Sequence, residues 1–222
     1  MQRSVPLFPL NTVVFPGLAV PLNVFEDRYR ALVHDLLRIN DPTERLFATV
    51  AIREGYEVGE RIGQSVHRVG CLLQLLHAEE HEDGSFSLET VARDRFSLLS
   101  IGAADPFLSA EVELLTDTSS PAAQARAPRL VELYEEYRGV IAEVRGHTTY
   151  PSPIPDDATY LAWVLAATCH LQLADRQQIL EAESTEQRLT MLERLIAMEM
   201  RAMRAVPSLP ATEIARTRWS PN

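Results

Sequence analysis

Residues 5–30 read VPLFPLNTVVFPGLAVPLNVFEDRYR, and this stretch decides how the fold begins. The segment Val5 to Leu10 is apolar but broken by prolines, which favours a strand at the edge of a sheet because proline cannot donate to a strand ladder. Pro16-Gly17 is a turn signal, and residues 19–25 form a second candidate strand. From Glu26 to Arg38 the apolar residues recur at steps of three and four, which predicts a helix with one buried face.

The chain continues in short strand-like segments up to about Leu115. Two of these segments are joined through Glu82-Asp83-Gly84, and Asp-Gly between strands is a strong hairpin signal. Several short strands with one inserted helix predict a small barrel or pseudo-barrel. The candidate strands after the helix are residues 46–52, 66–77, 86–101 and 107–115.

The second half of the sequence has helical periodicity. Residues 116–128 are rich in Ser, Ala and Pro and have no period, which predicts a linker. Apolar residues then recur at helical spacing from Leu130 to Val144, and residues 160–171 are apolar on nearly every side, as in the central helix of a bundle. We therefore expect an α+β chain with a β-rich part at 1–117, a helical bundle at 118–206 and a tail at 207–222.

Three helix starts in this half have capping signals. Asp157 precedes the apolar helix and can accept a hydrogen bond from its first turn. Asp175 with Gln178, and Ser184 with Gln187, have the spacing of a capping box. Each of these acidic or hydroxyl residues is predicted to begin a helix.

The charge composition excludes several classes of function. All 21 basic residues are arginine, so no lysine is present for a Schiff base, a Ser-Lys dyad or a Walker A loop. The net charge of −10 disfavours binding to nucleic acid and to anionic membrane surfaces. No uninterrupted apolar run is long enough for a signal peptide or a membrane span. We expect a cytoplasmic protein without a cofactor.

One cluster could hold a metal ion. His77 and His81 are four residues apart, carboxylates surround them, and Cys71 is near in sequence. On a strand the two histidines would face the same way. This pattern permits a zinc site in a metal-dependent hydrolase, and it equally suits a solvated hairpin tip.

Several spaced motifs agree with one family. They include the Leu7-Phe8-Pro9-Leu10 start, the Phe15-Pro16-Gly17 turn and the Phe25-Glu26-Asp27-Arg28-Tyr29 junction. With these motifs the chain resembles the N-terminal domain of Lon proteases over about residues 4–205. Further similar positions are Val69-Gly70-Cys71, Asp83-Gly84, Arg95-Phe96, Leu173 to Gln177 and Ile179 to Glu181.

The resemblance implies a β-rich PUA-like pseudo-barrel followed by a helical bundle, present as a stand-alone copy without the ATPase and protease domains. It also implies a non-catalytic module that binds unfolded or client polypeptides and works with a protease or an ATPase. A small-ligand-sensing adaptor resembling cereblon and a metal-dependent hydrolase are the alternatives. Aromatic contact area and arginine–carboxylate pairing suggest the candidate binding residues. These residues are Phe25, Glu26, Arg28 and Tyr29, with Arg53 and Tyr56 from a loop.

Overall fold

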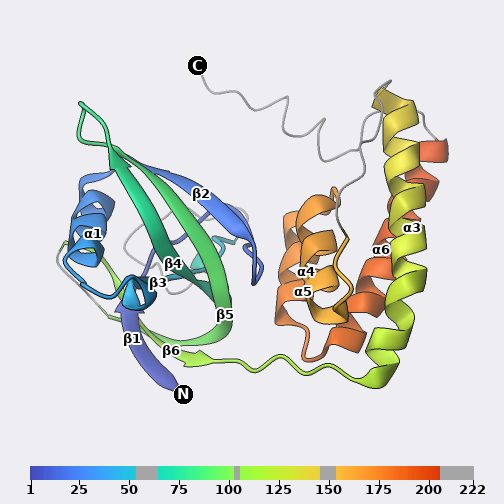
Figure 1. Ribbon diagram of the computed structural model, residues 1–222, viewed down its shortest axis with the longest axis horizontal. Coiled ribbons are helices and arrows are strands. Elements are labelled where there is room, and N and C mark those ends of the chain that lie inside the picture. Colours follow the sequence, from blue (N-terminus) through green and yellow to red (C-terminus); the bar gives the residue numbers. More distant parts are fainter. Residues whose placement is uncertain (54–64, 103–105, 146–153, 206–222) are drawn as a thin grey trace. The chain divides into compact units, whose positions relative to one another are not determined.

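The chain forms two compact units, Met1–Thr116 and Asp117–Asn222, shown in Figure 1. The structure is a computed structural model, and it describes residues 1–53, 65–102, 106–145 and 154–205. The first unit holds the strands and one long helix, and the second is helical. In the described part of the chain, no helix is long and apolar enough to cross a membrane.

The first unit is built on an antiparallel sheet. Its ladder runs in the order β1-β6-β5-β4-β3, and β2 pairs with a further part of β5. One helix, α1, is inserted between β2 and β3, so the predicted β-rich fold with an inserted helix is confirmed. The elements are β1 (Gln2–Pro6), β2 (Ala19–Val24), α1 (Asp27–Leu37), the 3-10 turn η1 (Pro42–Glu44), β3 (Leu46–Thr49), β4 (Val69–Glu80), β5 (Phe86–Gly102) and β6 (Ser109–Leu114).

The two ends of this sheet meet and close it into a pseudo-barrel. Beyond β1, the chain runs parallel to β3 and its continuation, with isolated bridges from Leu7 to Ala48 and from Leu10 to Ala51. The amide of Phe8 donates to the Ala48 carbonyl at 2.8 Å, and the amide of Leu10 donates to the Val50 carbonyl at 2.9 Å. Closure removes much of the free strand edge that an open sheet would present.

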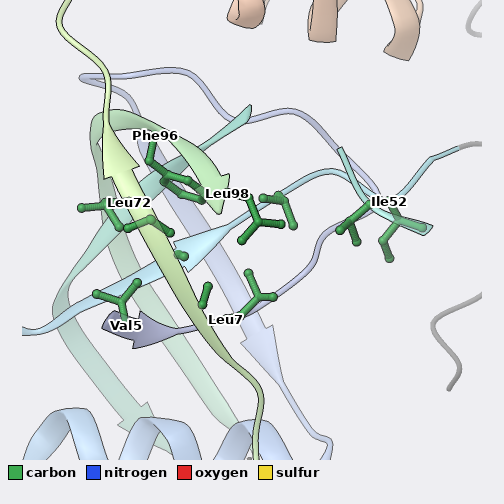
Figure 2. Packing of buried hydrophobic residues seen from close by; sticks show 11 residues of the cluster. Val5, Leu7, Ile52, Leu72, Phe96 and Leu98 are labelled. Atoms are coloured by element: carbon green, nitrogen blue, oxygen red, sulfur yellow. The ribbon is translucent and has the colours of Figure 1, made fainter. Parts of the chain in front are cut away.

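The core of the pseudo-barrel is apolar (Figure 2). Alternate residues of each strand point inward, so Val5 and Leu7 meet Leu72, Phe96 and Leu98. Burying each such side chain stabilises the fold by about 1.5–3 kcal/mol. The whole cluster comprises Val5, Leu7, Ala48, Val50, Ile52, Val66, Leu72, Phe96, Leu98, Ala110 and Val112.

Helix α1 packs on the outside of the sheet through the predicted apolar face. Its Tyr29 ring stacks on Phe8 with 4.0 Å between centroids, and Phe8 contacts Phe47 with 6.2 Å between centroids. A second buried layer therefore lies between the helix and the sheet. The buried residues of α1 are Tyr29, Leu32, Val33 and Leu36.

Two turns use glycine at positive φ, and both were predicted from sequence. Gly17 has φ 81° after Pro16, and Gly84 has φ 77° in the β4–β5 hairpin. In that hairpin the amide of Gly84 donates to the His81 carbonyl at 2.9 Å, and Asp83 Oδ1 accepts from the amide and hydroxyl of Ser85. These hydrogen bonds hold the pKa of Asp83 below its ordinary value.

The first helix of the second unit begins earlier than the sequence predicted. Helix α3 (Pro121–Arg145) starts inside the expected linker of residues 116–128 and contains Pro128. The hydroxyl of Ser120 accepts from the Ala123 amide at 3.1 Å, and Pro121 follows directly. Proline is favoured at the first helical position because the amide it lacks would have no partner there. Ser120-Pro121 was therefore the overlooked start signal.

Three more helices follow in the described residues of this unit, and two of the three predicted caps are confirmed. Asp157 Oδ1 accepts from the Tyr160 amide at 2.7 Å, and the Ser184 hydroxyl accepts from the Gln187 amide at 3.3 Å. The cap at Asp175 is wrong, because that residue lies inside the first turn of a helix whose N-cap is Gln172. The helices are α4 (Ala158–Thr168), α5 (Leu173–Glu181) and α6 (Thr185–Ala205).

Candidate functional site

Phe25 stands between the end of β2 and the start of α1, and its side chain is 74% exposed. Among the residues that the structure describes, it is the most exposed aromatic. The preceding residue, Val24, pairs with Phe86 at the start of β5, which places Phe25 beside the β4–β5 hairpin. A large apolar side chain held in water at a defined position is a candidate contact residue.

The residues that follow Phe25 give it a fixed base. The carboxylate of Glu26 accepts a hydrogen bond from Arg28 Nη2 at 2.6 Å, and the Arg28 guanidinium lies 4.6 Å from the centroid of the Tyr29 ring. Tyr29 is buried, and burial raises the pKa of its hydroxyl; Arg28 opposes the rise and Glu26 adds to it. Tyr29 therefore anchors the junction in the protein interior through its stack on Phe8.

Arg30 ties this junction to the hairpin turn. Its Nη1 donates to the Gly84 carbonyl at 3.4 Å, and its Nη2 donates to the carboxylate of Asp27. A Cβ atom at position 84 would lie 2.8 Å from Arg30 Nη1, so glycine leaves room for this contact. Arg30 was not among the predicted binding residues, and nothing local to residue 30 indicates a partner at residue 84.

Of the two loop residues in the predicted site, the structure describes Arg53 but not Tyr56. Arg53 lies beside Val66, where its Nε donates to the Val66 carbonyl at 3.1 Å and its amide donates to the Ser65 carbonyl at 2.8 Å. Tyr56 lies outside the described residues. The structure thus gathers Phe25, Glu26, Arg28 and Tyr29 in one junction and gives Arg53 a separate backbone anchor.

The histidine cluster has the character of a hairpin tip. His77 and His81 are both exposed, and His81 Nε2 lies 2.7 Å from the Ser87 hydroxyl. Cys71 is buried, and its thiol donates to the Val14 carbonyl at 3.2 Å. Within the described ranges, no group of three His, Cys, Asp or Glu side chains is placed to hold a metal ion. The geometry gives the metal-site hypothesis no support.

Two open hollows, which sequence reasoning missed, lie on either side of Arg3 and Glu44. The larger, of about 500 Å³, runs between β1 and the last residues of α1. The smaller, of about 330 Å³, has Leu46, Leu72 and Leu114 among its lining residues. Arg3 and Glu44 line both hollows and form an ion pair with 3.7 Å between Nη1 and Oε2. Both hollows depend on contacts between distant segments, so no local pattern predicts them.

Comparison with known proteins gives one family. The profile of the ATP-dependent protease La (LON) substrate-binding domain matches residues 4–198. Among curated proteins, Lon protease 2 of Herpetosiphon aurantiacus is 26% identical over 200 residues, covering 89% of this chain and 24% of the relative. Lon protease of Porphyromonas gingivalis is 30% identical over 118 residues, covering 53% and 13%. The chain spans about a quarter of the length of the first of these relatives.

Solved structures agree on the fold. The Lon N-terminal domain protein from Xanthomonas campestris has a TM-score of 0.61 at 24% identity, and the alignment covers 86% of this chain and 96% of that one. The N-terminal domain of the Mycobacterium avium complex Lon protease has a TM-score of 0.63 at 18% identity, covering 88% and 98%. These similarities support the expected strand-rich part followed by helices.

Proposed function

The chain belongs to the family of Lon protease substrate-binding domains, and from this premise we propose that it is a non-catalytic module that binds polypeptides in a non-native state. Folded proteins bury most of their large apolar side chains, whereas unfolded chains expose them. A binding surface for unfolded chains therefore needs an exposed apolar contact of its own. The proposal also accords with the absence of lysine, which closes lysine-dependent catalysis to this chain.

The observation that carries the proposal is the exposure of Phe25 on a rigid base. The neighbouring Tyr29 is locked by its stack on Phe8, and Arg30 holds the helix start to the hairpin turn. An aromatic presented in this way loses little conformational freedom when it binds, so more of its contact energy contributes to affinity. Glu26 and Arg28 beside it supply polar contacts of both signs.

The test compares an unfolded protein with its folded form. A fluorescently labelled, reduced and carbamidomethylated protein is titrated with this chain, and the native form of the same protein is titrated in parallel. We expect binding to the unfolded form and a loss of about tenfold in affinity for Phe25→Ser, the magnitude typical of removing an aromatic contact. Circular dichroism and thermal unfolding should stay at wild-type values, because Phe25 contributes little to the core.

The matched control is Leu99→Ser. Leu99 is also an exposed apolar residue, at 43%, but it lies in β5 far beyond Phe86 along the strand. It should bind as well as the wild type. Equal losses for the two variants would refute a specific role for Phe25, and equal affinity for native and unfolded protein would refute the proposed function.

We extend the proposal to the fate of the bound chain. The curated relatives are Lon proteases, so we infer that a cytoplasmic protease or ATPase receives the polypeptides that this module binds. Affinity capture from the source cytosol with the wild type and with Phe25→Ser would identify such a partner. A protease that is captured equally by both proteins would bind another surface of the module.

A further inference from the structure

The parallel pairing that closes the pseudo-barrel stops at Pro6. Phe8 donates to Ala48, and Leu10 donates to Val50, so donors recur at every second residue. The next donor toward the N-terminus would be residue 6, and its acceptor would be the carbonyl of Leu46. Proline has no amide hydrogen, so this bond cannot form and the closure ends there. Strands β1 and β3 accordingly share no ladder in the sheet order.

In an antiparallel pair, hydrogen-bonded and non-hydrogen-bonded residues alternate along each strand. This alternation shows which backbone groups of β1 point away from β6, toward β3. Leu7 donates to Leu108 at 2.8 Å, and Met1 accepts from Leu114 at 3.1 Å, so the odd residues of β1 bond to β6 and its flanking residues. The amides and carbonyls of Gln2 and Ser4 therefore point away from β6. At Gln2 and Ser4 this edge, the open edge of β1, belongs to no strand ladder of the described sheet, although β1 and β3 contact each other.

The same argument fixes the direction of Leu46 in β3. Leu75 donates to the carbonyl of Arg45 at 2.9 Å, so residue 45 bonds toward β4. Leu46 is the next residue, and it faces the opposite way, toward β1. The Leu46 carbonyl and the open edge of β1 thus border one gap.

The larger hollow lies at this gap. Its volume of about 500 Å³ is within the range of ligand-binding pockets. Its apolar lining includes Leu36 of α1 and Phe107 before β6, and its charged lining consists of one arginine and two carboxylates. The lining residues are Arg3, Ser4, Val5, Pro6, Asp35, Leu36, Ile39, Glu44, Leu46 and Phe107.

We propose that the open edge of β1 binds an extended segment of polypeptide, which pairs with the backbone of Gln2 and Ser4 as an added strand. The proposal rests on the proposed polypeptide-binding function and names a second contact surface for it. Main-chain pairing is nearly independent of sequence, and alternate side chains of the added strand would contact the apolar lining. This form of recognition suits a module that meets many different unfolded chains.

Charge indicates which segments bind best. Glu44 is 60% exposed and Asp35 is 48% exposed, and each has one arginine partner, Arg3 and Arg38 respectively. The unpaired carboxylate lone pairs remain available to a further cation. The whole chain carries a net charge of −10, which adds long-range attraction for basic segments. The preferred occupant is therefore an extended segment with alternating apolar residues and a basic residue near Glu44.

The first experiment changes only the main-chain donor. Ser4→Pro removes the amide that faces the gap, and proline is tolerated at such an edge position. Ser4→Ala keeps the amide and is the matched control. The probe is a short labelled peptide that alternates valine and arginine. We expect Ser4→Pro to bind it about tenfold more weakly and Ser4→Ala to bind it like the wild type, because one or two main-chain hydrogen bonds are lost.

The second experiment leaves the protein unchanged, so it is informative even if Ser4→Pro fails to fold. The same peptide is synthesised with alternate backbone nitrogens methylated in either of two registers. One register should bind about tenfold more weakly than the other, because only one set of amides faces the protein in a strand. Amide exchange at Gln2 and Ser4 should slow when the unmethylated peptide binds.

The outcomes separate this inference from the proposed function. Unchanged binding by Ser4→Pro, with no difference between the methylated registers, overturns the added strand while polypeptide binding itself stands. A peptide that carries glutamate in place of arginine and binds equally well overturns the preference for basic segments. If the wild type binds neither the peptide nor unfolded protein, the proposed function and this inference are both wrong.

Discussion

Arg188 Nη2 donates a hydrogen bond of 2.6 Å to Asp117 Oδ1, although the Arg188 side chain is fully buried in the helical unit. The same nitrogen donates to the Ala182 carbonyl at 2.9 Å, and the guanidinium lies 4.1 Å from the centroid of the Trp163 ring. One side chain of α6 therefore holds the first residue of this unit, the end of α5 and the central helix α4. Guanidinium suits this place because it combines several donors with a flat face for stacking.

Removing this arginine should destabilise the helical unit severely. We expect Arg188→Met to lower the free energy of unfolding by about 2–3 kcal/mol, because the Asp117 carboxylate and the buried Ala182 carbonyl both lose their donor. Arg204→Met is the control, since Arg204 pairs with Glu136 at the surface and should contribute less than about 1 kcal/mol. Urea denaturation of both variants measures the difference. Similar losses for the two would contradict the central role of Arg188.

Substitution by alanine should have opposite effects on stability at two of the glycines. A Cβ atom at Gly70 would collide with the Thr49 carbonyl oxygen and lie 2.9 Å from Phe96 Cζ, so Gly70→Ala should cost more than about 3 kcal/mol. At Gly139, inside α3, a Cβ atom meets nothing within 4 Å. Gly139→Ala should therefore stabilise the protein by about 0.5–1 kcal/mol. Thermal unfolding of the two variants shows whether the signs differ.

The two predicted aspartate caps should also differ. Asp157→Ala removes the hydrogen bond to the Tyr160 amide and should cost about 1 kcal/mol. Asp175 lies within the first turn of α5, where a carboxylate interacts only with the helix dipole, so Asp175→Ala should cost less than about 0.5 kcal/mol. Chemical denaturation resolves this difference. A larger loss of stability for Asp175→Ala would mean that the carboxylate stabilises α5 through an interaction other than the one with the helix dipole.

Glu199 makes stability depend on pH. Burial raises the pKa of its carboxyl above the ordinary value, so the folded state favours the protonated form. The stability of the folded state is highest below the ordinary glutamate pKa and falls as pH rises through the raised value. Glu199→Gln should therefore be more stable than the wild type at about pH 7, by less than about 1 kcal/mol because the group is partly solvated. At about pH 4 the advantage should disappear. If Glu199→Gln is more stable than the wild type by the same amount at every pH, ionisation of Glu199 is not the cause.

The parts of the fold that sequence predicted depend on neighbours in the chain. The turn at Gly17 follows from Pro16, and the helix after Glu26 follows from the spacing of Tyr29 and the apolar residues after it. Helix α3 was predicted too late, because residues 116–128 are rich in Ser, Ala and Pro and lack an apolar period, which favoured a linker. In the structure, packing of α3 against α6 outweighs the one hydrogen bond that Pro128 omits.

The candidate site also has parts that local sequence predicts and parts that depend on distant contacts. The junction from Phe25 to Tyr29 is a continuous stretch, so its residue types were visible as a group. The contact of Arg30 with Gly84 and the hollow beside β1 need a known pairing of distant strands. The effect of Pro6 on closure is also hidden in the sequence, because it depends on Leu46 being the residue opposite.

The pairing of β1 with β6 has a consequence for the order of folding. Gln2 lies opposite Glu113, so the first strand must wait for the last strand of its unit before its ladder can form. Contacts of such long sequence separation form late, because a large loop must close first. During synthesis the hairpin of β4 and β5 can form while β1 is still unpaired. The N-terminal strand is therefore exposed to chaperones and proteases until Leu114 has left the ribosome.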